Sequence, residues 1–284
     1  MPLLYYWRPD NHQHDLDFGV GYHLNQATPR LHDIEVGDSL WAFTRRRDGS
    51  QALAMQLVVR AKTHNRAGYR YGPYRLWGDL QHSRYFLLDG QPPLDPLIRT
   101  LSLQVRADKI GQAFQGHAAV RRITAADDEL LHAHARGLLP EPRARLIPEE
   151  RFEALAVAGD HEAVERLLFA EGPGLAAERR SYLYETTVSR ARQHTQALRE
   201  RYRDRCQLCA WCGLDRYQRP LCEAHHLQWL SRGGEDTLDN LVLLCPNHHR
   251  AVHAADAVLD FQGLAFVFDP ERREVLREPG HLAG

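Results

Sequence analysis

Short apolar runs separated by turn residues mark the first third of the chain. They read LLYYWR, DSLWAFTRR, QALAMQLVVRAKT and SRYFLLDGQPP, at residues 3–8, 38–46, 51–63 and 83–93. These runs are rich in β-branched and aromatic residues and are bounded by Gly, Pro and Asp, which is typical of β-strands. Their close spacing predicts a mainly β domain, an antiparallel barrel or sandwich.

Helical spacing replaces this pattern from Thr124 onward. Apolar residues recur at helical intervals in residues 125–139 and again in residues 148–172. Thr124 or the acidic residues after it can cap the first of these helices. The Pro-rich stretch LLPEPRARLIPEE, residues 138–150, is a turn-rich connector, and we place a domain boundary there.

A further helix is expected over residues 177–203, and strands are expected near the end of the chain at 257–261 and 264–270. The pattern as a whole predicts an α+β protein. We expect a β domain at 1–138, a helical linker at 139–178 and a second domain at 179–284.

The composition is that of a globular protein, with 284 residues of which 43% are hydrophobic and 26% charged. No apolar stretch approaches the ~18–20 residues that cross a bilayer. The first residues show no secretory signal. We therefore expect a cytoplasmic protein without membrane contacts. In a reducing compartment its five cysteines are expected to be thiols or metal ligands rather than disulfides.

Charge is unevenly distributed along the chain. A net charge of −1 argues against indiscriminate coating of nucleic acid, because such binding is largely electrostatic. Eight arginines nevertheless lie close together, at positions 179, 180, 190, 192, 199, 201, 203 and 205. Such a basic strip can steer a polyanion toward a neighbouring site. A solvated helical face is the alternative interpretation.

Two short motifs have the spacing of a structural zinc site. Cys206 and Cys209 form a C-x2-C pair, and Cys245 and His248 form a C-x2-H pair. Together they supply the four sulfur and nitrogen ligands of a tetrahedral zinc. Cys212 can replace Cys206 as the partner of Cys209, so the sequence leaves two versions of the first pair open.

The remaining histidines of this region do not fit that zinc. His249 and His253 are four residues apart, which places both on one face of a helix. His225 and His226 lie in an apolar stretch that reads as a strand, where neighbouring side chains point to opposite sides. One of this pair can join His249 and His253 on a cation, while its neighbour stays free to transfer protons.

The string from Cys222 to His253, within residues 190–268, resembles the HNH, or ββα-metal, nuclease family. In that family two strands and a helix hold one divalent cation, and many members add a zinc knuckle. The resemblance implies a cation held by His225, His249 and His253, a general base at His226, the central Asn at Asn240, and a zinc knuckle of Cys206, Cys209, Cys245 and His248.

The resemblance also implies a chemistry. His226 would take the proton from a water that attacks a DNA phosphodiester, and the cation would neutralise the departing 3′ oxygen. Asn240 would hold the loop and the backbone carbonyl that orients the His226 ring. Three imidazoles favour Ni²⁺, Cu²⁺ or Zn²⁺ over Mg²⁺ by affinity alone. The sequence leaves the working ion open among Mg²⁺, Mn²⁺ and Ni²⁺.

The phrase LHDIEVGDSLWAFTRR, residues 31–46, resembles the glycine–aspartate turn and aromatic strand of PUA-like barrels, including the EVE branch. In nuclease fusions such barrels sense a modified base that is rotated out of the duplex. This implies an aromatic pocket, for which Trp7, Tyr22 and Trp77 are the candidates. Trp41, which alternates with Phe43, is expected in the core.

We therefore expect a metal-dependent endonuclease that acts on double-stranded DNA with modified bases, as type IV restriction enzymes do. Two alternatives remain: an HNH nuclease of toxin or mobile-element type that ignores modification, and a non-catalytic zinc-dependent nucleic-acid binder. One ββα-metal site cuts one strand at a time. A homodimer would explain cutting of both strands, and the sequence leaves this open.

Overall fold

The computed structural model describes residues 1–115, 119–171 and 177–283, with the backbone alone at 170–171, 177–178, 182 and 185–192. The chain divides into two compact units. Unit 1 comprises residues 1–16, 22–62 and 67–144, and unit 2 comprises residues 17–21, 63–66 and 145–284. Within the described residues, no helix has the length and apolar character needed to traverse a bilayer.

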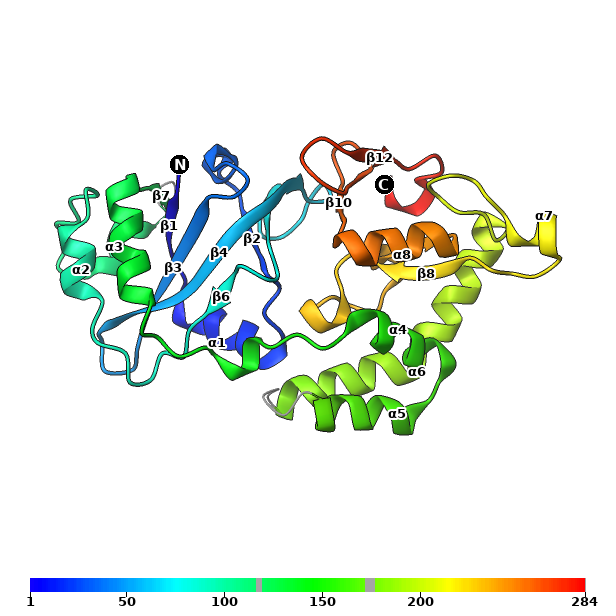
Figure 1. Ribbon diagram of the computed structural model, residues 1–284, viewed down its shortest axis with the longest axis horizontal. Helices are drawn as coiled ribbons and strands as arrows, with labels where there is room; N and C mark the ends of the chain where they lie inside the picture. The colour runs from blue at the N-terminus through cyan, green and yellow to red at the C-terminus, as the bar shows by residue number, and fades with distance from the viewer. Residues whose placement is uncertain (116–118, 172–176, 284) are drawn as a thin grey trace. The chain divides into compact units, whose positions relative to one another are not determined.

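Unit 1 is built on one curled, mixed sheet (Figure 1). Its strands are β1 (Leu3–Tyr6), β2 (His23–Gln26), β3 (Ser39–Arg45), β4 (Gln51–His64), β5 (Tyr74–Gly78), β6 (Arg84–Tyr85) and β7 (Val120–Arg122). The strand order is β2-β5-β4-β3-β1-β7, and β6 pairs with β4. Because β2 and β7 do not pair among the described residues, the sheet is an open half-barrel. The expected α+β class is confirmed in this form.

The strand pairing differs from the expected antiparallel arrangement at one place. β1 and β3 are parallel, with Leu4 opposite Trp41, whereas β3 and β4 are antiparallel. A parallel pair needs a long crossover connection. That connection contains α1 (Pro9–Phe18) and β2, which the apolar pattern did not predict. Only His12 and Leu16 of α1 are buried, so this helix carries almost no apolar periodicity.

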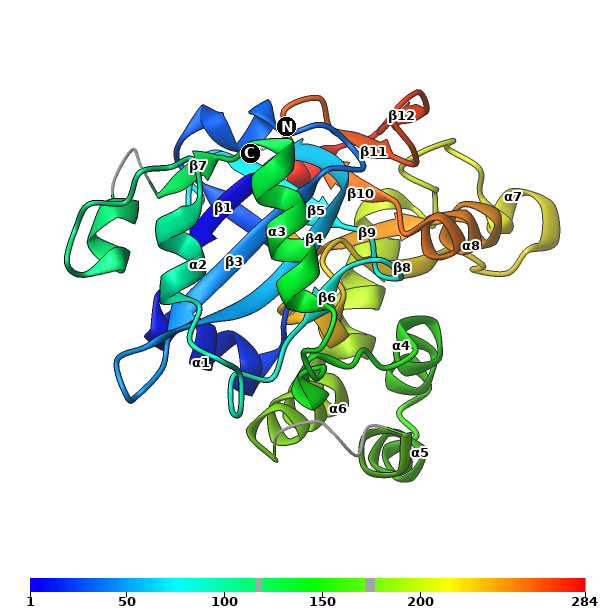
Figure 2. The ribbon, with the colours of Figure 1, turned by 60° about the vertical axis from the view of Figure 1, so that its left-hand side comes forward.

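Helices α2 (Asp95–Thr100) and α3 (Ala125–Ala135) pack on the sheet of unit 1 (Figure 2). Their buried residues Ile98 and Leu131 join Trp41 and Phe43 in one apolar cluster, which confirms the core position expected for Trp41. The Trp41 indole Nε1 donates to Asp128 Oδ1 at 2.6 Å. This bond satisfies the polar end of a side chain that is 0% exposed.

The predicted cap of α3 is confirmed as a capping box. Asp127 N donates to Thr124 Oγ1 at 3.1 Å, and Thr124 N donates to Asp127 Oδ2 at 2.9 Å. These bonds satisfy two of the backbone donors that a helix start leaves without partners. Asp127 also accepts from the backbone and the hydroxyl of Ser102. The capping carboxylate therefore ties the helix start to the preceding loop.

From residue 145 onward, unit 2 consists first of helices and then of small sheets. Its helices are α4 (Glu149–Ala158), α5 (His161–Arg166), α6 (Ala177–Tyr202), α7 (Gly213–Tyr217) and α8 (Pro246–Ala255), and its strands are β8 (Glu223–His226), β9 (Leu241–Leu244), β10 (Val258–Asp260), β11 (Ala265–Val267) and β12 (Arg273–Val275). Short 3-10 or π turns lie at Pro29–Asp33, Ile110–Phe114, Pro142–Ala144, Leu167–Glu171, Leu230–Arg232, Leu238–Asn240 and Gly280–Leu282.

The strand pair β8–β9 and the helix α8 form a compact ββα arrangement (Figure 2). β8 and β9 are antiparallel, and α8 follows β9 directly. Val242 and Leu244 of β9, Val252 of α8 and Leu198 of α6 are buried in one apolar cluster. This core fixes the spacing of the strand and the helix that carry the histidines.

Candidate functional site

Strand β8 places two neighbouring histidines on opposite faces. His225 lies opposite Val242 and His226 lies opposite Leu241 in the antiparallel register. Successive side chains of a strand point to opposite sides. Both rings are buried, His225 completely. The two side chains of the doublet therefore lie in separate environments, although they belong to one short strand.

Helix α8 brings two more imidazoles to the His225 side. The helix begins after Cys245 with Pro246 in its first turn, where a missing N–H has no cost. His249 and His253 lie one turn apart, with ring centroids 4.7 Å from each other. The His225 ring lies 5.4 Å from His249 and 4.6 Å from His253. The three histidines expected to hold a cation thus come together.

A carboxylate from α4 lies at the centre of this group. Glu153 Oε2 is 2.9 Å from His253 Nε2 and 3.4 Å from His249 Nε2. Glu153 and the three histidines each offer one ligand atom within 4.8 Å of the others. Three imidazoles and one carboxylate are donors that bind divalent transition metals. The residues present therefore fit a divalent cation.

The contacts of the ring nitrogens determine which of them is directed at the group. Glu223 Oε2 lies 2.7 Å from His249 Nδ1, which leaves Nε2 of that ring for the group. Burial lowers the pKa of His225 to about 4, against the opposing charge of Glu153. A neutral imidazole has the lone pair that a metal ligand requires.

His226 stays outside this donor group, and both of its nitrogens are engaged. Nδ1 lies 2.8 Å from Glu153 Oε1, and Nε2 lies 3.1 Å from Asp236 Oδ1. Burial alone would lower the pKa of His226, but these two carboxylates outweigh it and raise the pKa to about 10. Both ring nitrogens therefore have carboxylate partners, which favour the protonated form of the ring.

Two neighbouring acids of α4 have opposite electrostatic behaviour. Burial would raise the pKa of Glu153, but the surrounding imidazoles lower it well below its usual value. Burial, and then the charge of Glu153, raise the pKa of Glu149. Glu149 accepts from the backbone N–H groups of Leu230 and Ser231 at 2.7 and 3.0 Å. These bonds hold the start of α4 against the segment that follows β8.

Asn240 closes the loop between the two strands. Its Nδ2 donates to the carbonyls of Gln228 and Glu235, both at 2.8 Å, and its Oδ1 accepts from Gln228 N at 2.8 Å. Leu227 N donates to the Asn240 carbonyl at 2.8 Å. Asn240 therefore fixes the backbone directly after His226, while Glu153 and Asp236 contact the ring itself.

The two sulfur-containing motifs converge on a second group of donors. The Sγ atoms of Cys209 and Cys245 are 3.9 Å apart, and His248 Nδ1 lies 3.2 Å from Cys245 Sγ and 3.5 Å from Cys206 Sγ. Ligands on one tetrahedral zinc are separated by about 3.4–3.8 Å for the usual bond lengths. Cys212 lies elsewhere, with its thiol 3.6 Å from the Arg203 carbonyl. The geometry therefore selects Cys206 over Cys212.

The arginines of residues 179–205 do not form one open basic strip among the described side chains. Arg179 is fully buried and donates to the Ser231 carbonyl. Arg199 donates to the Cys222 carbonyl at 2.9 Å, and Arg205 pairs with Asp215 at 2.9 Å. The side chains of Arg190 and Arg192 lie outside the described residues. Several of these arginines thus hold loops of unit 2 together.

The aromatic residues expected to form a base pocket belong to unit 1. Trp7 and Tyr22 both contact the ring of Tyr85 edge-on, with centroid distances of 6.2 and 4.9 Å. Trp77 instead lies 5.2 Å from the ring of His23 and under the Arg75 guanidinium. All three candidates are buried. Trp7 and Tyr22 therefore share the neighbour Tyr85, and Trp77 has His23 and Arg75 beside it.

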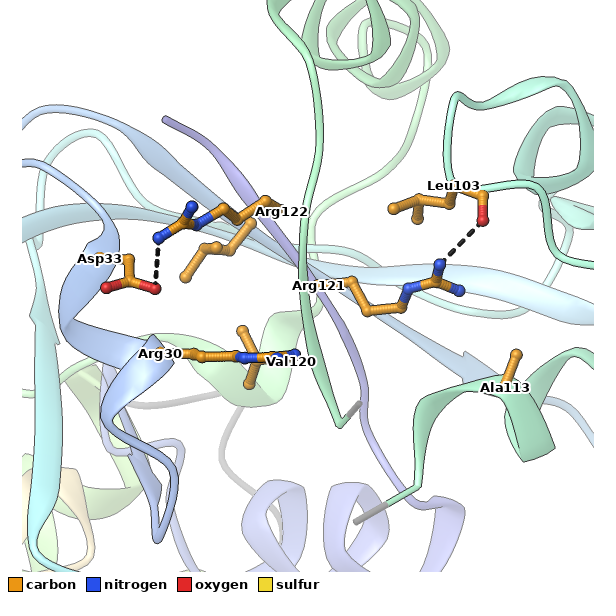
Figure 3. A pocket seen from close by; sticks show the side chains of 8 residues that line it. Arg30, Asp33, Leu103, Ala113, Val120, Arg121 and Arg122 are labelled. Atoms are coloured by element: carbon orange, nitrogen blue, oxygen red, sulfur yellow. Dashed lines mark hydrogen bonds and ion pairs between the residues drawn. The ribbon is translucent and has the colours of Figure 1, made fainter. Parts of the chain in front are cut away.

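A cavity of about 760 Å³ opens elsewhere in unit 1 (Figure 3). Its lining contains three arginines, Arg30, Arg121 and Arg122. Arg122 pairs with Asp33 at 2.7 Å, and Arg121 donates to the Leu103 carbonyl at 2.8 Å. None of the expected pocket aromatics lies among its lining residues.

Four acidic residues of the site were not predicted: Glu149, Glu153, Glu223 and Asp236. Glu223 lies in β8 two residues before His225, and Asp236 lies ten residues after His226, so the signal for both is their closeness in sequence to the histidine doublet. Glu149 and Glu153 lie in a helix far upstream, where their spacing to the histidines carries no signal.

Comparisons with known proteins agree with this geometry. Residues 206–255 match the HNH endonuclease family. The Type IV methyl-directed restriction enzyme EcoKMcrA of Escherichia coli (strain K12) is 59% identical over 34 residues, which are 12% of this chain and 12% of that protein. The ββα arrangement, the histidine positions and the family match coincide in one segment.

Among solved structures, the Type IV phosphorothioation-dependent restriction endonuclease ScoMcrA is similar at 18% identity over 76% of this chain and 42% of that chain, with a TM-score of 0.21. A score this low carries no conclusion about a shared fold. This chain thus spans 12% and 42% of the lengths of these two proteins. The family match and the donor geometry together identify residues 206–255 as an HNH endonuclease domain.

Proposed function

We propose that the whole chain is a metal-dependent endonuclease that cuts double-stranded DNA with modified bases, in the manner of type IV restriction. The HNH domain supports the cutting activity. The relative from Escherichia coli is described as methyl-directed, which supports selection by modification. One observation carries the proposal: a fourth imidazole, His226, lies beside a group of three imidazoles without joining it.

The proposed roles follow the geometry of the donors. His225, His249 and His253 would hold a divalent cation, such as Mg²⁺, Mn²⁺ or Ni²⁺. A bound divalent cation stabilises the negative charge that develops on a phosphate and its leaving oxygen. Cys206, Cys209, Cys245 and His248 would hold a structural zinc, which joins the loop after α6 to the start of α8.

His226 would handle the proton of the attacking water. Its two carboxylate contacts, Glu153 at Nδ1 and Asp236 at Nε2, fix the plane of the ring. The ring must be neutral to accept that proton, so one proton would first pass from the ring to a partner carboxylate such as Asp236, and the freed nitrogen would then accept the proton of the water. Asn240 would keep the backbone after His226 in place through its bonds to Gln228 and Glu235. His226 would thus be the acid–base residue, and Asn240 would hold the backbone next to it.

Unit 1 would supply the selection of DNA. Trp7, Tyr22 and Trp77 remain the proposed pocket residues, since aromatic rings stack on a base that leaves the duplex. Because these rings are buried, a base would enter only where the rings move apart. A homodimer would place a second nuclease site on the opposite strand.

Digestion of three matched plasmids tests this proposal. Unmodified, cytosine-modified and adenine-methylated DNA are incubated with the full chain and Mn²⁺, and His226→Ala protein serves as the inactive control. We expect cutting of one modified DNA at a rate at least tenfold above that of the unmodified DNA. Equal cutting of all three would favour the modification-independent alternative. No nicks at any protein concentration would overturn the endonuclease proposal.

A further inference from the structure

Glu153 is the one member of the histidine group that lies outside the matched HNH segment. The family match covers residues 206–255, whereas Glu153 belongs to α4. It precedes His226 by 73 residues and His253 by 100 residues. The fold of unit 2 therefore brings an acidic side chain from a separate helix into the centre of the nuclease site.

The distances around Glu153 have the values expected for ligands of one ion. Its Oε2 lies 2.9 Å from His253 Nε2, 3.4 Å from His249 Nε2 and 3.7 Å from His225 Nδ1. The two nitrogens of His225 and His253 are themselves 3.2 Å apart. Nitrogen and oxygen ligands at tetrahedral angles on one ion are about 3.4 Å apart. All four donors thus fit around a single centre.

The carboxylate is fixed in this position by the surrounding protein. The Glu153 side chain is 4% exposed, so it is not a mobile surface acid. Its second oxygen, Oε1, accepts from His226 N at 3.0 Å and contacts His226 Nδ1 at 2.8 Å. Glu149, one turn earlier in α4, anchors the helix through Leu230 N and Ser231 N. Both oxygens of Glu153 therefore have defined partners.

We propose that Glu153 is the fourth protein ligand of the nuclease cation, an anionic oxygen donor beside three imidazoles. The inference rests on the proposed function, because it assigns a further residue to the same ion. Carboxylate oxygen is a harder donor than imidazole, so its presence shifts the preference of the site toward Mn²⁺ and Mg²⁺. One carboxylate would also link the ion to the ring of His226.

Calorimetric titration of the full chain with Mn²⁺ tests the assignment without a cleavage assay. The zinc site is first filled, and the wild type is compared with Glu153→Gln, Glu150→Gln and His253→Ala. Glu150 is exposed on the same helix, so its substitution removes the same charge at a distance from the donors. We expect Glu153→Gln to weaken Mn²⁺ binding by about 10- to 100-fold and Glu150→Gln by less than twofold.

The variants separate the failure of this inference from that of the proposed function. Wild-type affinity in Glu153→Gln, with weakened binding in His253→Ala, would overturn the role of Glu153 alone. Unchanged binding in His253→Ala would count against the ion site itself. Zinc content and melting temperature establish that each variant is folded.

Should Glu153→Gln fail to fold, crystals of the wild-type chain soaked in Mn²⁺ provide the second test. An anomalous peak within about 2.2 Å of Glu153 Oε2 and of the three imidazoles would support the assignment. A peak held by the imidazoles, with the carboxylate turned away, would overturn it.

Discussion

A single polar contact decides which nitrogen of His249 faces the donor group. Glu223 occupies Nδ1 of His249 and thereby leaves Nε2 for the group. His226 has a carboxylate at both nitrogens and stays outside the group. Residues with the same side chain thus acquire different chemistry from their neighbours, as buried titratable groups generally do.

Replacing His226 with alanine tests this difference at the level of one ring. We expect the rate of DNA cutting to fall by about 10²–10⁴-fold, because general-base catalysis contributes this much. Binding of Mn²⁺ should remain within threefold of wild type, since His226 is not one of the donors around the ion. The cutting rate and a calorimetric titration measure the two effects.

His161→Ala is the matched control, because His161 is exposed at the start of α5. It should leave both the cutting rate and ion binding unchanged. Loss of Mn²⁺ binding in His226→Ala would show that this ring is a ligand, and the division of roles within the doublet would then be wrong.

Asp127 offers a test of the capping box in unit 1. Burial would raise its pKa, but the hydrogen bonds from Ser102 and Thr124 outweigh this and lower it. A carboxylate whose folded pKa is depressed stabilises the protein above the unfolded pKa, and this stability is lost as pH falls through the folded pKa. We expect Asp127→Asn to cost about 0.5–2 kcal/mol at pH 7.

The loss caused by Asp127→Asn should begin to shrink as the pH falls below about 4, the pKa of an unfolded aspartate, and should disappear once the pH is below the depressed pKa of the folded carboxyl. Urea unfolding curves at pH 7 and pH 3 measure the change. Asp89→Asn, at an exposed position, is the control. If the difference in free energy of unfolding between wild type and Asp127→Asn is the same at pH 7 and pH 3, this explanation is wrong.

Among the elements, the loop after α6 is held to the start of α8 by the four-donor cysteine group. Cys206 and Cys209 come from that loop, while Cys245 and His248 flank the first turn of the helix. The same helix carries His249 and His253. A zinc at this group would therefore set the position of the helix that carries His249 and His253.

Two single substitutions distinguish the proposed zinc ligand Cys209 from its near neighbour Cys212. Cys209→Ser should reduce zinc from about one ion per chain to almost none and lower the melting temperature, because structural zinc sites contribute folding energy. Cys212→Ser should retain zinc, since the Cys212 thiol contacts the Arg203 carbonyl instead. Elemental analysis of the purified variants measures this. Zinc loss in Cys212→Ser but not in Cys209→Ser would refute the assigned set.

The parts of the fold that were predictable from sequence are those with local spacing. The C-x2-C and C-x2-H pairs, the histidine doublet and the four-residue interval on α8 each lie within one element or two adjacent ones. The core strands were visible through apolar runs. Helix α1 was not, because it buries only His12 and Leu16.

Long-range packing accounts for what the sequence did not reveal. Glu153 meets the histidines only because α4 folds back over a separation of 73 to 100 residues. An acidic residue in an amphipathic helix is normally on its solvated face. Its pattern therefore gives no sign of a buried role. The domain boundaries at 138/139 and 178/179 remain predictions from the sequence. The structure separately divides the chain into two compact units.

On the scale of the whole molecule, each unit has a core of its own. Trp41, Phe43 and Ile98 belong to the cluster of unit 1, while Val242, Val252 and other residues form that of unit 2. We expect two calorimetric transitions. A strong chelator should lower the midpoint temperature of the unit 2 transition, because the cysteine group lies in unit 2. The other transition should stay within about 1–2 °C of its midpoint without chelator.

Readdition of zinc should restore the shifted transition, whereas Mg²⁺ should not, since magnesium prefers oxygen ligands. The heat-capacity scan is recorded with and without chelator at one protein concentration. Equal shifts of both transitions would show that the stability of the two units is not separable.

The nuclease unit is also discontinuous along the chain, since residues 17–21 and 63–66 belong to it. Gly21 accepts from the Arg232 guanidinium at 3.2 Å, and Asp260 accepts from His64 N at 2.8 Å. Engineers who join a different N-terminal domain to unit 2 at residue 145 would discard both short stretches. A chimaera that transplants all three pieces is the one that preserves the cutting module.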